Sequence, residues 1–380
     1  MITYIIIWVV VFLLSIKIFN KLTTGKCYDH TVMSGKVVVV TGASGGIGFE
    51  TALELARRGA KVIVACRSEQ RGEKAVRRII RKTRNKRIRF MHLDLTSIKS
   101  IRVFVDEFKS SEAKLDVLIN NAGAILTTRE RTEDGILMDL QINYLGPFLL
   151  TVLLVPMLKR AVFSRVIVVS SAWHKFGTID DLNSDKHGYI QAYANSKLCN
   201  ILFSNELSRR LEDTGVVVNS LNPGQVNTSL YRSSTVLEKL RSLLLYAFFK
   251  TPEEGAQTSV YMAISDDCAE VTGRYFEDCG EAKPSSRALD ESLAAKLWEE
   301  SRELVGMTQI ELEECFKKGR GSPRRGVART AAAAGTRGTR TPLPIRSGVR
   351  HVHLGSIYTS AESKQITKSE HNKFNLNSRV

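Results

Sequence analysis

Short runs of consecutive apolar residues, rich in β-branched side chains, recur along the chain and predict its strands. They lie at residues 36–42, 61–66, 88–93, 115–119, 165–169 and 216–221. Such runs are typical of parallel strands that are buried on both faces. Helices are predicted at 49–58, 135–158 and 289–305, where longer apolar or amphipathic stretches occur. The first strand and the amphipathic stretch after it indicate the beginning of a βαβ unit.

The N-terminus carries the longest uncharged stretch. No residue from 2 to 16 is charged, and the apolar run continues through Phe19, close to the shortest length that spans a bilayer. No basic region precedes it and no small-residue cleavage site follows, so an uncleaved transmembrane anchor at 1–20 fits better than a signal peptide. A buried helix of a soluble domain is the alternative. Residues 21–35 are predicted to be a linker.

Three features favour a catalytic domain on the cytosolic side. Lys17, Lys21 and Lys26 follow the apolar run, and the positive-inside rule places them in the cytosol. An acceptor sequence for glycosylation at 227–229 falls in a loop where a glycan would obstruct the predicted site. Six scattered cysteines without framework spacing indicate reduced thiols. We expect a single-pass protein of the endoplasmic reticulum or a related membrane.

A glycine-rich turn follows the first strand. Residues 41–48 read TGASGGIG, so glycines stand at 42, 46 and 48 between the strand and a helix. Glycines there allow a tight turn and close approach of the backbone to a pyrophosphate at the helix N-terminus. The spacing differs from G-x-G-x-x-G, and an ordinary glycine-rich turn is the alternative. The position between strand and helix favours a dinucleotide site.

The end of the second strand predicts which dinucleotide is bound. Many NAD-binding folds place an acid there to hold the ribose 2′-hydroxyl, but this chain has Cys66 and Arg67. An arginine attracts a 2′-phosphate, so NADP(H) is predicted over NAD(H); a solvated surface arginine is the other interpretation. Asp94 ends the third strand and can accept from the adenine amino group. The amides of residues 120–123 can order the sheet or line the cofactor groove.

Tyr193 and Lys197 predict the chemistry. A phenol is a poor general acid at neutral pH, but a nearby ammonium favours the phenolate, so the pair can exchange protons with an alcohol or carbonyl. The i,i+4 spacing places both side chains on one helix face. Alone, the spacing is also that of an ordinary polar pair on a surface helix. The cofactor motifs upstream favour the catalytic interpretation.

Together these motifs resemble the classical short-chain dehydrogenase/reductase superfamily over residues 36–306. The resemblance implies an α/β fold: a single doubly wound Rossmann-type domain with a seven-stranded parallel sheet, here placed at 36–316. It implies a nicotinamide cofactor, no metal, and four catalytic residues, namely Asn143, Ser171, Tyr193 and Lys197. The implied cofactor-binding residues are Gly42, Ser44, Gly46, Ile47, Gly48, Arg67, Asp94, Leu95, Asn121, Ala122, Gly123, Tyr193, Lys197, Pro223, Gly224, Val226 and Thr228.

Two serines end the strand at 165–169, and the second matches the family. Ser171 is therefore the implied partner of the substrate oxygen, with Ser170 as the alternative. Twenty-two positions separate Ser171 from Tyr193, more than in many members. The excess is a polar insertion at 176–188, which we expect to loop out at the rim of the site. A long insertion is typical of the retinol-metabolising branch.

Pro147 is a departure from the family pattern. Because proline has no N–H, it cannot bond to the carbonyl of Asn143 four residues earlier. This leaves that carbonyl free to hold a water of the proton relay that the resemblance implies; a disturbing kink is the competing interpretation. We predict that Pro147→Ala lowers turnover, and unchanged kcat in a steady-state assay would remove the role of the freed carbonyl.

The segment after the sixth strand concerns the substrate. The resemblance places Pro223 and Gly224 under the nicotinamide and Thr228 at its carboxamide and phosphate. Residues 230–250 are strongly apolar and stand where the family has its substrate lid, which predicts a lipophilic substrate. The anchor, the insertion and residues 193–206 and 274–281 resemble the membrane-bound retinol dehydrogenase/retinal reductase branch. Other lipid aldehydes, steroids or polyprenols are alternative substrates, and a silent membrane-tethered scaffold is the alternative class.

The positive charge lies in the C-terminal tail. Residues 317–380 contain 14 basic and two acidic residues, whereas the whole chain has a formal net charge of +16. Few large apolar residues occur there, so the tail is predicted to be disordered. An inert extension or an alternative transcript end is favoured over electrostatic binding, and no nucleic-acid partner is expected. The oligomeric state is left open.

Overall fold

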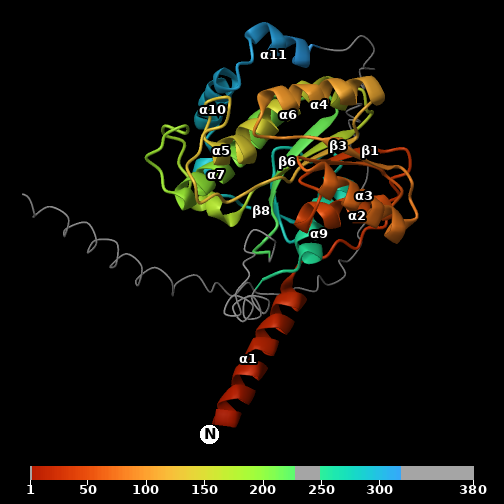
Figure 1. The fold of residues 1–380 in the computed structure, drawn as a ribbon, viewed down its shortest axis with the longest axis vertical. Helices are drawn as coiled ribbons and strands as arrows, with labels where there is room; N and C mark the ends of the chain where they lie inside the picture. Colours follow the sequence, from red (N-terminus) through yellow and green to blue (C-terminus); the bar gives the residue numbers. More distant parts are fainter. Residues whose placement is uncertain (1, 227–248, 318–380) are drawn as a thin grey trace, which may run out of the picture. The chain divides into compact units, whose positions relative to one another are not determined.

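The computed structural model describes residues 2–226 and 249–317, within one compact unit of residues 1–322. Eight strands form one sheet in the order β3-β2-β1-β4-β5-β6-β7-β8 (Figure 1). The strands are β1 Val37–Thr41, β2 Lys61–Cys66, β3 Ile88–His92, β4 Val117–Asn120, β5 Ser164–Val169, β6 Val216–Asn222, β7 Tyr275–Glu277 and β8 Gly280–Ala282.

The direction of winding reverses at β1. From β1 the chain adds β2 and β3 on one side and then returns to place β4 on the other, with all of these pairs parallel. In open α/β sheets, ligands bind where the carboxyl ends of the strands diverge at such a reversal. The crevice between the ends of β1 and β4 is therefore the expected ligand site.

The sheet is not the seven-stranded parallel one that the sequence predicted. It has an eighth strand, β8, which pairs antiparallel with β7. Asp278 and Cys279 form the two-residue turn between them, with φ angles of 47° and 60°. Two left-handed residues in succession give a turn whose twist matches that of a hairpin. Neither residue is glycine, so the usual hairpin signal was absent from the sequence.

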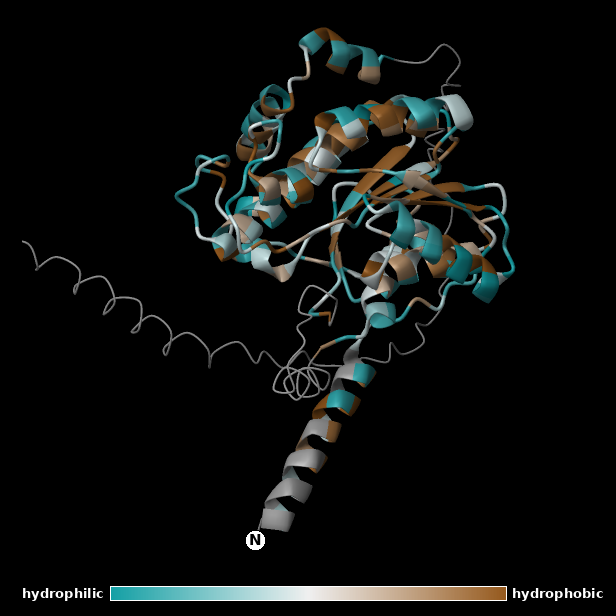
Figure 2. Cartoon of the chain, in the orientation of Figure 1, coloured by the Kyte–Doolittle hydropathy of each residue, from teal (hydrophilic) through white to brown (hydrophobic). Residues whose placement is uncertain are grey.

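Helices cover both faces of the sheet and make two separate cores. Alternate residues of one strand face opposite cores: Val37 and Val39 of β1 belong to one, Val38 and Val40 to the other. The hydrophobic strands lie between the helical layers (Figure 2). One layer contains α4 Ile98–Ser111, α6 Gly146–Lys159, α7 Tyr189–Arg210, α10 Glu291–Leu304 and α11 Gln309–Phe316; the other contains α2 Gly46–Arg57, α3 Glu69–Thr83 and α9 Pro252–Ile264.

The apolar segments separate into a core helix and the N-terminal helix. Among the described residues, Met138–Lys159 is long and apolar enough to cross a bilayer, but 89% of its 18-residue apolar window is buried inside the domain. It is therefore a core helix. The first helix, α1 Ile2–Thr23, contains the predicted anchor, and Tyr4, Trp8 and Phe12 on it are exposed.

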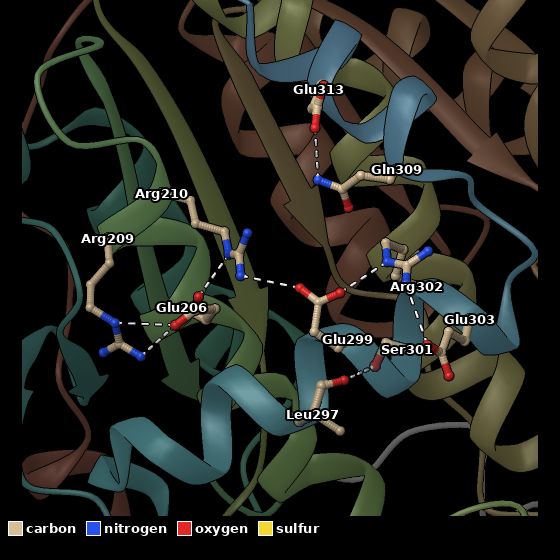
Figure 3. A network of polar contacts seen from close by, with 10 residues as sticks. All are labelled: Glu206, Arg209, Arg210, Leu297, Glu299, Ser301, Arg302, Glu303, Gln309 and Glu313. Atoms are coloured by element: carbon tan, nitrogen blue, oxygen red, sulfur yellow. Dashed lines mark hydrogen bonds and ion pairs between the residues drawn. The ribbon is translucent and has the colours of Figure 1, made fainter.

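The C-terminal end of α7 is fixed to α10 by packing and charge. Trp298 of α10 is buried, and the Arg210 guanidinium lies 4.3 Å from the centroid of its ring. Glu206 accepts from Arg209 and Arg210, and Arg210 reaches Glu299 at 3.6 Å (Figure 3). Half-exposed ion pairs of this kind contribute at most about 1 kcal/mol each. The buried indole therefore contributes most to holding α7, and the charges orient it.

Several predicted segments can now be located. The helix predicted at 135–158 begins at Met138, because Gly135, with φ of 76°, lies in a turn before it. All six cysteines are unpaired thiols. Most of the predicted lid, residues 230–248, and the tail from residue 318 lie outside the described residues.

Candidate active site

Helix α7 presents Tyr193 and Lys197 on the same face. Tyr193 is half-buried, whereas Lys197 is buried, with 3% of its surface exposed. The Lys197 Nζ lies 5.4 Å from the centroid of the Tyr193 ring and donates to the Val169 carbonyl at 3.1 Å. The Nδ2 of Asn200 donates to the same carbonyl at 3.3 Å. The end of β5 therefore holds the ammonium beside the phenol, as the i,i+4 spacing predicted.

Burial also changes the titration of Lys197. Desolvation lowers its pKa from 10.5 to about 8, because the cation loses water that one carbonyl only partly replaces. The side chain is thus charged at neutral pH but becomes neutral in mildly alkaline solution. A buried cation next to a phenol stabilises the phenolate more strongly than an exposed one does.

The two serines after β5 have different environments. Ser170 is buried, and its hydroxyl donates to the Lys197 carbonyl at 2.7 Å. Ser171 is half-buried and begins the short helix η2 Ala172–Phe176, where its Oγ accepts from the Trp173 N–H at 3.4 Å. The hydroxyl proton of Ser171 can still be donated to a ligand. The geometry therefore favours Ser171 over Ser170 as the substrate-facing serine.

Asn143 lies in a π-helical turn, η1 Gln141–Leu145, in which the Gly146 N–H bonds to the Gln141 carbonyl. Its side chain binds the backbone of Ala124 twice: Nδ2 donates to the carbonyl at 2.8 Å and Oδ1 accepts from the N–H at 2.7 Å. A Cβ on Gly123 would lie 3.3 Å from Asn143 Oδ1 and 3.4 Å from Lys197 Nζ. Asn143 and Lys197 therefore converge on Gly123.

The π turn explains what Pro147 does locally. Single π turns occur mostly at functional sites, and they widen the helix by one residue. Pro147 follows this turn within the continuous helix Met138–Lys159, so its missing N–H leaves a carbonyl one turn earlier without the usual helical donor. The sequence predicted an ordinary α-helix here. Pro147 shows where a backbone hydrogen bond is missing, but it does not show that the preceding turn becomes a π turn.

The glycine-rich turn has the form needed to hold a pyrophosphate. Gly42 and Gly46 have φ angles of 68° and 58°, and a Cβ on Gly48 would lie 2.4 Å from Asn121 Nδ2. Gly45 precedes α2, no side chain caps that helix end, and a Cβ on Gly45 would meet nothing within 4 Å. Open space in front of uncapped helix N–H groups fits a bound anion. Ser44 and Ile47 lie within this turn.

Arg67, Asp94 and Leu95 lie just after β2 and β3, where the adenosine part of the cofactor is predicted to bind. Arg67 follows β2 directly and is exposed, with no ion pair among the described residues. One Asp94 carboxylate oxygen is already occupied, since it accepts from the N–H and hydroxyl of Thr96 at 2.9 and 2.7 Å. Leu95 is buried. Arg67 is therefore the accessible charged group, and Asp94 has one oxygen left to accept a bond.

The amides after β4 mainly join strands. Asn121 Nδ2 donates to the Thr41 carbonyl at 2.9 Å, and the N–H groups of Asn121 and Ala122 both donate to the Thr41 hydroxyl. Asn120 donates to the Thr151 hydroxyl at 2.7 Å. These bonds fix the carboxyl ends of β1 and β4 beside the crevice. These amides therefore order the sheet, which is one of the two roles that the sequence suggested for them.

The loop after β6 is described only in part. Gly224 has φ of 80°, and its N–H donates to the Asn222 side chain at 3.1 Å. Val226 forms an isolated parallel bridge with Lys250. Pro223 begins this turn, and Thr228 lies outside the described residues. Gly224 therefore adopts a left-handed conformation that glycine favours, in the tight turn after β6.

The insertion at 176–188 is more closely packed than a loop at the rim. Ile179 and Leu182 are buried, and the Asn183 carboxamide oxygen accepts from the Leu137 N–H at 2.8 Å. The insertion thus packs over the segment that precedes η1. Phe176, the first residue of the insertion, and Trp173 just before it are exposed, with ring centroids 5.8 Å apart.

Sequence reasoning missed His174, three residues after Ser171. Its ring is buried, lies 2.7 Å from the Ser171 carbonyl oxygen through Nδ1, and accepts a bond at Nε2 from the Ser285 N–H at 3.0 Å. Its spacing from Ser171 in SSAWH was the one available signal. Ser285 lies more than a hundred residues away, so the contact could not be read from the sequence.

A doubly wound sheet, a glycine turn at its crevice and a tyrosine–lysine pair on α7 are the features expected of a dinucleotide-dependent oxidoreductase. Residues 36–237 match the family model described as short chain dehydrogenase. The chain belongs to the short-chain dehydrogenase family, in its retinol dehydrogenase branch.

Relatives in the branch cover most of the chain. Retinol dehydrogenase 14 from Homo sapiens is 45% identical over 298 residues, which are 73% of this chain and 89% of the relative. Retinol dehydrogenase 13 from Homo sapiens is 43% identical over 304 residues, covering 78% and 92%. Among solved structures, an uncharacterized protein from Mycobacterium paratuberculosis has a TM-score of 0.60 and 34% identity, covering 75% of this chain and 98% of that one.

A more distant structure agrees in fold. A short-chain dehydrogenase from Shigella flexneri complexed with NADP has a TM-score of 0.53 at 23% identity, covering 66% of this chain and all of that one. The predicted family and the Rossmann-type α/β fold are confirmed. The individual roles of the site residues stay predictions.

Proposed function

We propose that this protein is an NADP(H)-dependent oxidoreductase that interconverts a lipophilic alcohol and its carbonyl compound, with retinol and retinal as the preferred pair. The observation that carries the proposal is the convergence of Asn143 and Lys197 on Gly123, with the Tyr193 ring beside Lys197, in a fold that also has a glycine turn fit for a dinucleotide. A silent scaffold gains nothing from burying Lys197 next to a tyrosine, since burying a cation costs free energy.

The chain's own residues supply proton transfer and orientation. When bound, the nicotinamide gives or takes the hydride. In the reductive direction, the Tyr193 hydroxyl protonates the developing alkoxide, and Lys197 stabilises the phenolate that remains. The Ser171 hydroxyl donates to the substrate oxygen and holds it close to Tyr193. The residues of the glycine turn and Arg67 hold the phosphates.

The proposal of a retinoid substrate rests on the relatives and on the rim of the site. The similar chains from Homo sapiens are named retinol dehydrogenases. Trp173 and Phe176 are 43% and 66% exposed close to Ser171, and exposed aromatic pairs favour an apolar ligand. Other lipid aldehydes, steroids and polyprenols would satisfy the same surface.

We propose that α1 anchors the protein in the endoplasmic reticulum or a related membrane, with the catalytic domain in the cytosol. The helix is 22 residues long, and Trp8, Phe12 and Leu22 on it are exposed. Exposed apolar side chains along a helix of this length are costly in water and stable in a bilayer. Lys17 and Lys21 near the C-terminal end of the helix, and Lys26 just after it, favour the cytosolic side.

The full-length protein in membranes tests the activity directly. NADPH oxidation is followed with retinal, a steroid ketone and a medium-chain aldehyde, and the retinol formed is quantified. Turnover of retinal at the highest kcat/KM supports the proposal. Turnover of only the steroid ketone or the medium-chain aldehyde would assign the protein to another substrate class. Absence of turnover with every carbonyl tested would favour the catalytically silent scaffold.

We expect Arg67→Ala to weaken the binding of NADPH but not the binding of NADH. Loss of one charge-assisted pair to the 2′-phosphate should raise the KM for NADPH by roughly tenfold and leave the KM for NADH unchanged. Arg81→Ala, at the other end of α3 and equally exposed, is the matched control. Equal effects of Arg67→Ala on both cofactors, or wild-type preference for NADH, would contradict the role of Arg67.

A further inference from the structure

His174 is a buried histidine whose two ring nitrogens are both used. Its side chain is 1% exposed. Nδ1 lies 2.7 Å from the Ser171 carbonyl oxygen, and because a carbonyl only accepts, Nδ1 carries the proton. The Ser285 backbone N–H points at Nε2 from 3.0 Å, so Nε2 accepts and carries none. The bonds together fix a neutral imidazole in one tautomer.

The Ser171 carbonyl is held by two donors from the same residue. The His174 backbone N–H also donates to it, at 3.1 Å. The first turn of η2, on which Ser171 stands, is therefore closed by both the backbone and the ring of His174. Loss of the ring leaves one bond to the carbonyl and leaves the Ser285 N–H without its acceptor.

Ser285 belongs to a segment that is itself fixed to α7. It precedes the short helix η5 Ser286–Leu289. The Asn205 side chain of α7 donates to the Ala288 carbonyl at 2.9 Å, and Arg287 donates to the Gly177 carbonyl at 3.1 Å. A chain of bonds thus leads from Ser171 through His174 and η5 to the helix that carries Tyr193.

We propose that His174 is a positioning residue for Ser171, which sets the Ser171 hydroxyl relative to Tyr193 only while the imidazole is neutral. The inference rests on the proposed function, in which Ser171 and Tyr193 act on one substrate oxygen. Protonation would place an Nε2–H against the Ser285 N–H, so that two donors face each other. The tether to η5 would then break, and Ser171 would lose its fixed position.

The surroundings of the ring oppose that protonation at neutral pH. Burial lowers the pKa of His174 below its usual 6.5, and Lys175 on the same turn lowers it further, whereas the Ser171 carbonyl and Glu277 on β7 raise it. The Tyr275 ring of β7 lies 5.3 Å away, edge to face. Helix α7 packs against η2, and Arg287 of η5 donates to the Gly177 carbonyl just after η2. The two charged groups that act on the ring, Lys175 and Glu277, oppose each other, so burial sets the direction of the pKa change.

Two replacements separate the two ring bonds. In His174→Asn the amide Nδ2 stands where Nδ1 was and can still donate to the Ser171 carbonyl. In His174→Gln the longer side chain reaches the Nε2 position and leaves that carbonyl with the backbone bond alone. We expect each variant to lower kcat for retinal reduction by about tenfold, because each breaks one of the two ring bonds that join Ser171 to η5, with the KM for NADPH unchanged.

The pH profile adds a readout that a purely structural role would not give. Because the folded pKa is depressed, folded protein binds the proton less readily than unfolded protein, so stability falls as pH decreases below about 6.5. Wild-type kcat should also fall in acid, as His174 of the folded protein becomes protonated. This acidic decrease in kcat should be absent from both variants. His30→Asn, at an exposed histidine of the linker, is the control that keeps the wild-type profile.

The ¹⁵N spectrum of the histidine rings in the full-length protein separates this inference from the proposed function. The His174 resonance, assigned by its loss in His174→Asn, should show a neutral ring with the proton on Nδ1. If retinal is not turned over, the proposed function fails. The spectrum would still show whether His174 Nε2 is the unprotonated acceptor of the Ser285 N–H. A proton on Nε2, ordinary titration near 6.5, or wild-type kcat in either variant would overturn the inference.

Discussion

Replacing Tyr193 with phenylalanine is expected to lower kcat for carbonyl reduction by about three orders of magnitude, the middle of the range for a positioned general acid. The substitution removes one oxygen and keeps the ring that packs beside Lys197. Cofactor affinity and the melting temperature should therefore change little. Steady-state kinetics with NADPH and retinal, together with NADPH titration by fluorescence, measure both quantities.

The same helix offers a matched control. Tyr189 lies one turn before Tyr193 on α7 and is exposed, so Tyr189→Phe removes the same oxygen from the same helix. It should retain wild-type kcat. Residual turnover of Tyr193→Phe within about tenfold of wild type would show that the phenol is not the main proton donor.

Replacing Lys197 with methionine should have the second largest effect, a fall in kcat of about a hundredfold, because the Tyr193 phenolate loses its cation. The fold should tolerate the change. Asn200 continues to donate to the Val169 carbonyl, and the unbranched methionine fills similar space. Kinetics at pH 7 and thermal unfolding measure the two effects separately.

The pH dependence of this variant has a defined sign. With a pKa of about 8, Lys197 is charged below that pH and neutral above it, so wild-type kcat/KM should decrease as the pH rises through about 8. This alkaline decrease in kcat/KM should be absent from Lys197→Met. Because the depressed pKa means that folded protein binds the proton less readily, wild-type stability should gain between pH 8 and 10.5 while the variant shows no such gain.

A surface lysine provides the comparison for this variant. Lys296 of α10 is exposed, and Lys296→Met should keep both the wild-type rate and the alkaline decrease in kcat/KM. If Lys197→Met retains turnover within about threefold, or still loses activity near pH 8, the cation is not what activates Tyr193.

The chemistry of the candidate site was largely readable from the sequence because its signals are local. An i,i+4 pair fixes Tyr193 and Lys197 on one helix face, and a strand, glycines and a helix in succession fix the phosphate turn. The order of these motifs gave the family, which the comparisons confirm. Their catalytic and cofactor-binding roles stay predictions until the variants are measured.

Features that depend on distant partners were not readable. The eighth strand required Asp278 and Cys279 to adopt left-handed angles, which residues other than glycine rarely do and which the sequence therefore does not signal. The π turn at Asn143 depends on packing around η1. Ser170 and Ser171 are neighbours of the same type, and only the bond of Ser170 to the Lys197 carbonyl shows that Ser170 is occupied.

The sequence by itself therefore determined the family, the positions of the first six strands and the residue types that can transfer a proton, since these follow from periodicity, short spacings and the order of the motifs. The tertiary structure decided the environment of those residues. Burial against β5 brings the pKa of Lys197 to about 8, and the approach of Ser285 fixes the tautomer of His174. Desolvation and contacts across more than a hundred residues depend on the packing of the whole sheet, which no local pattern specifies.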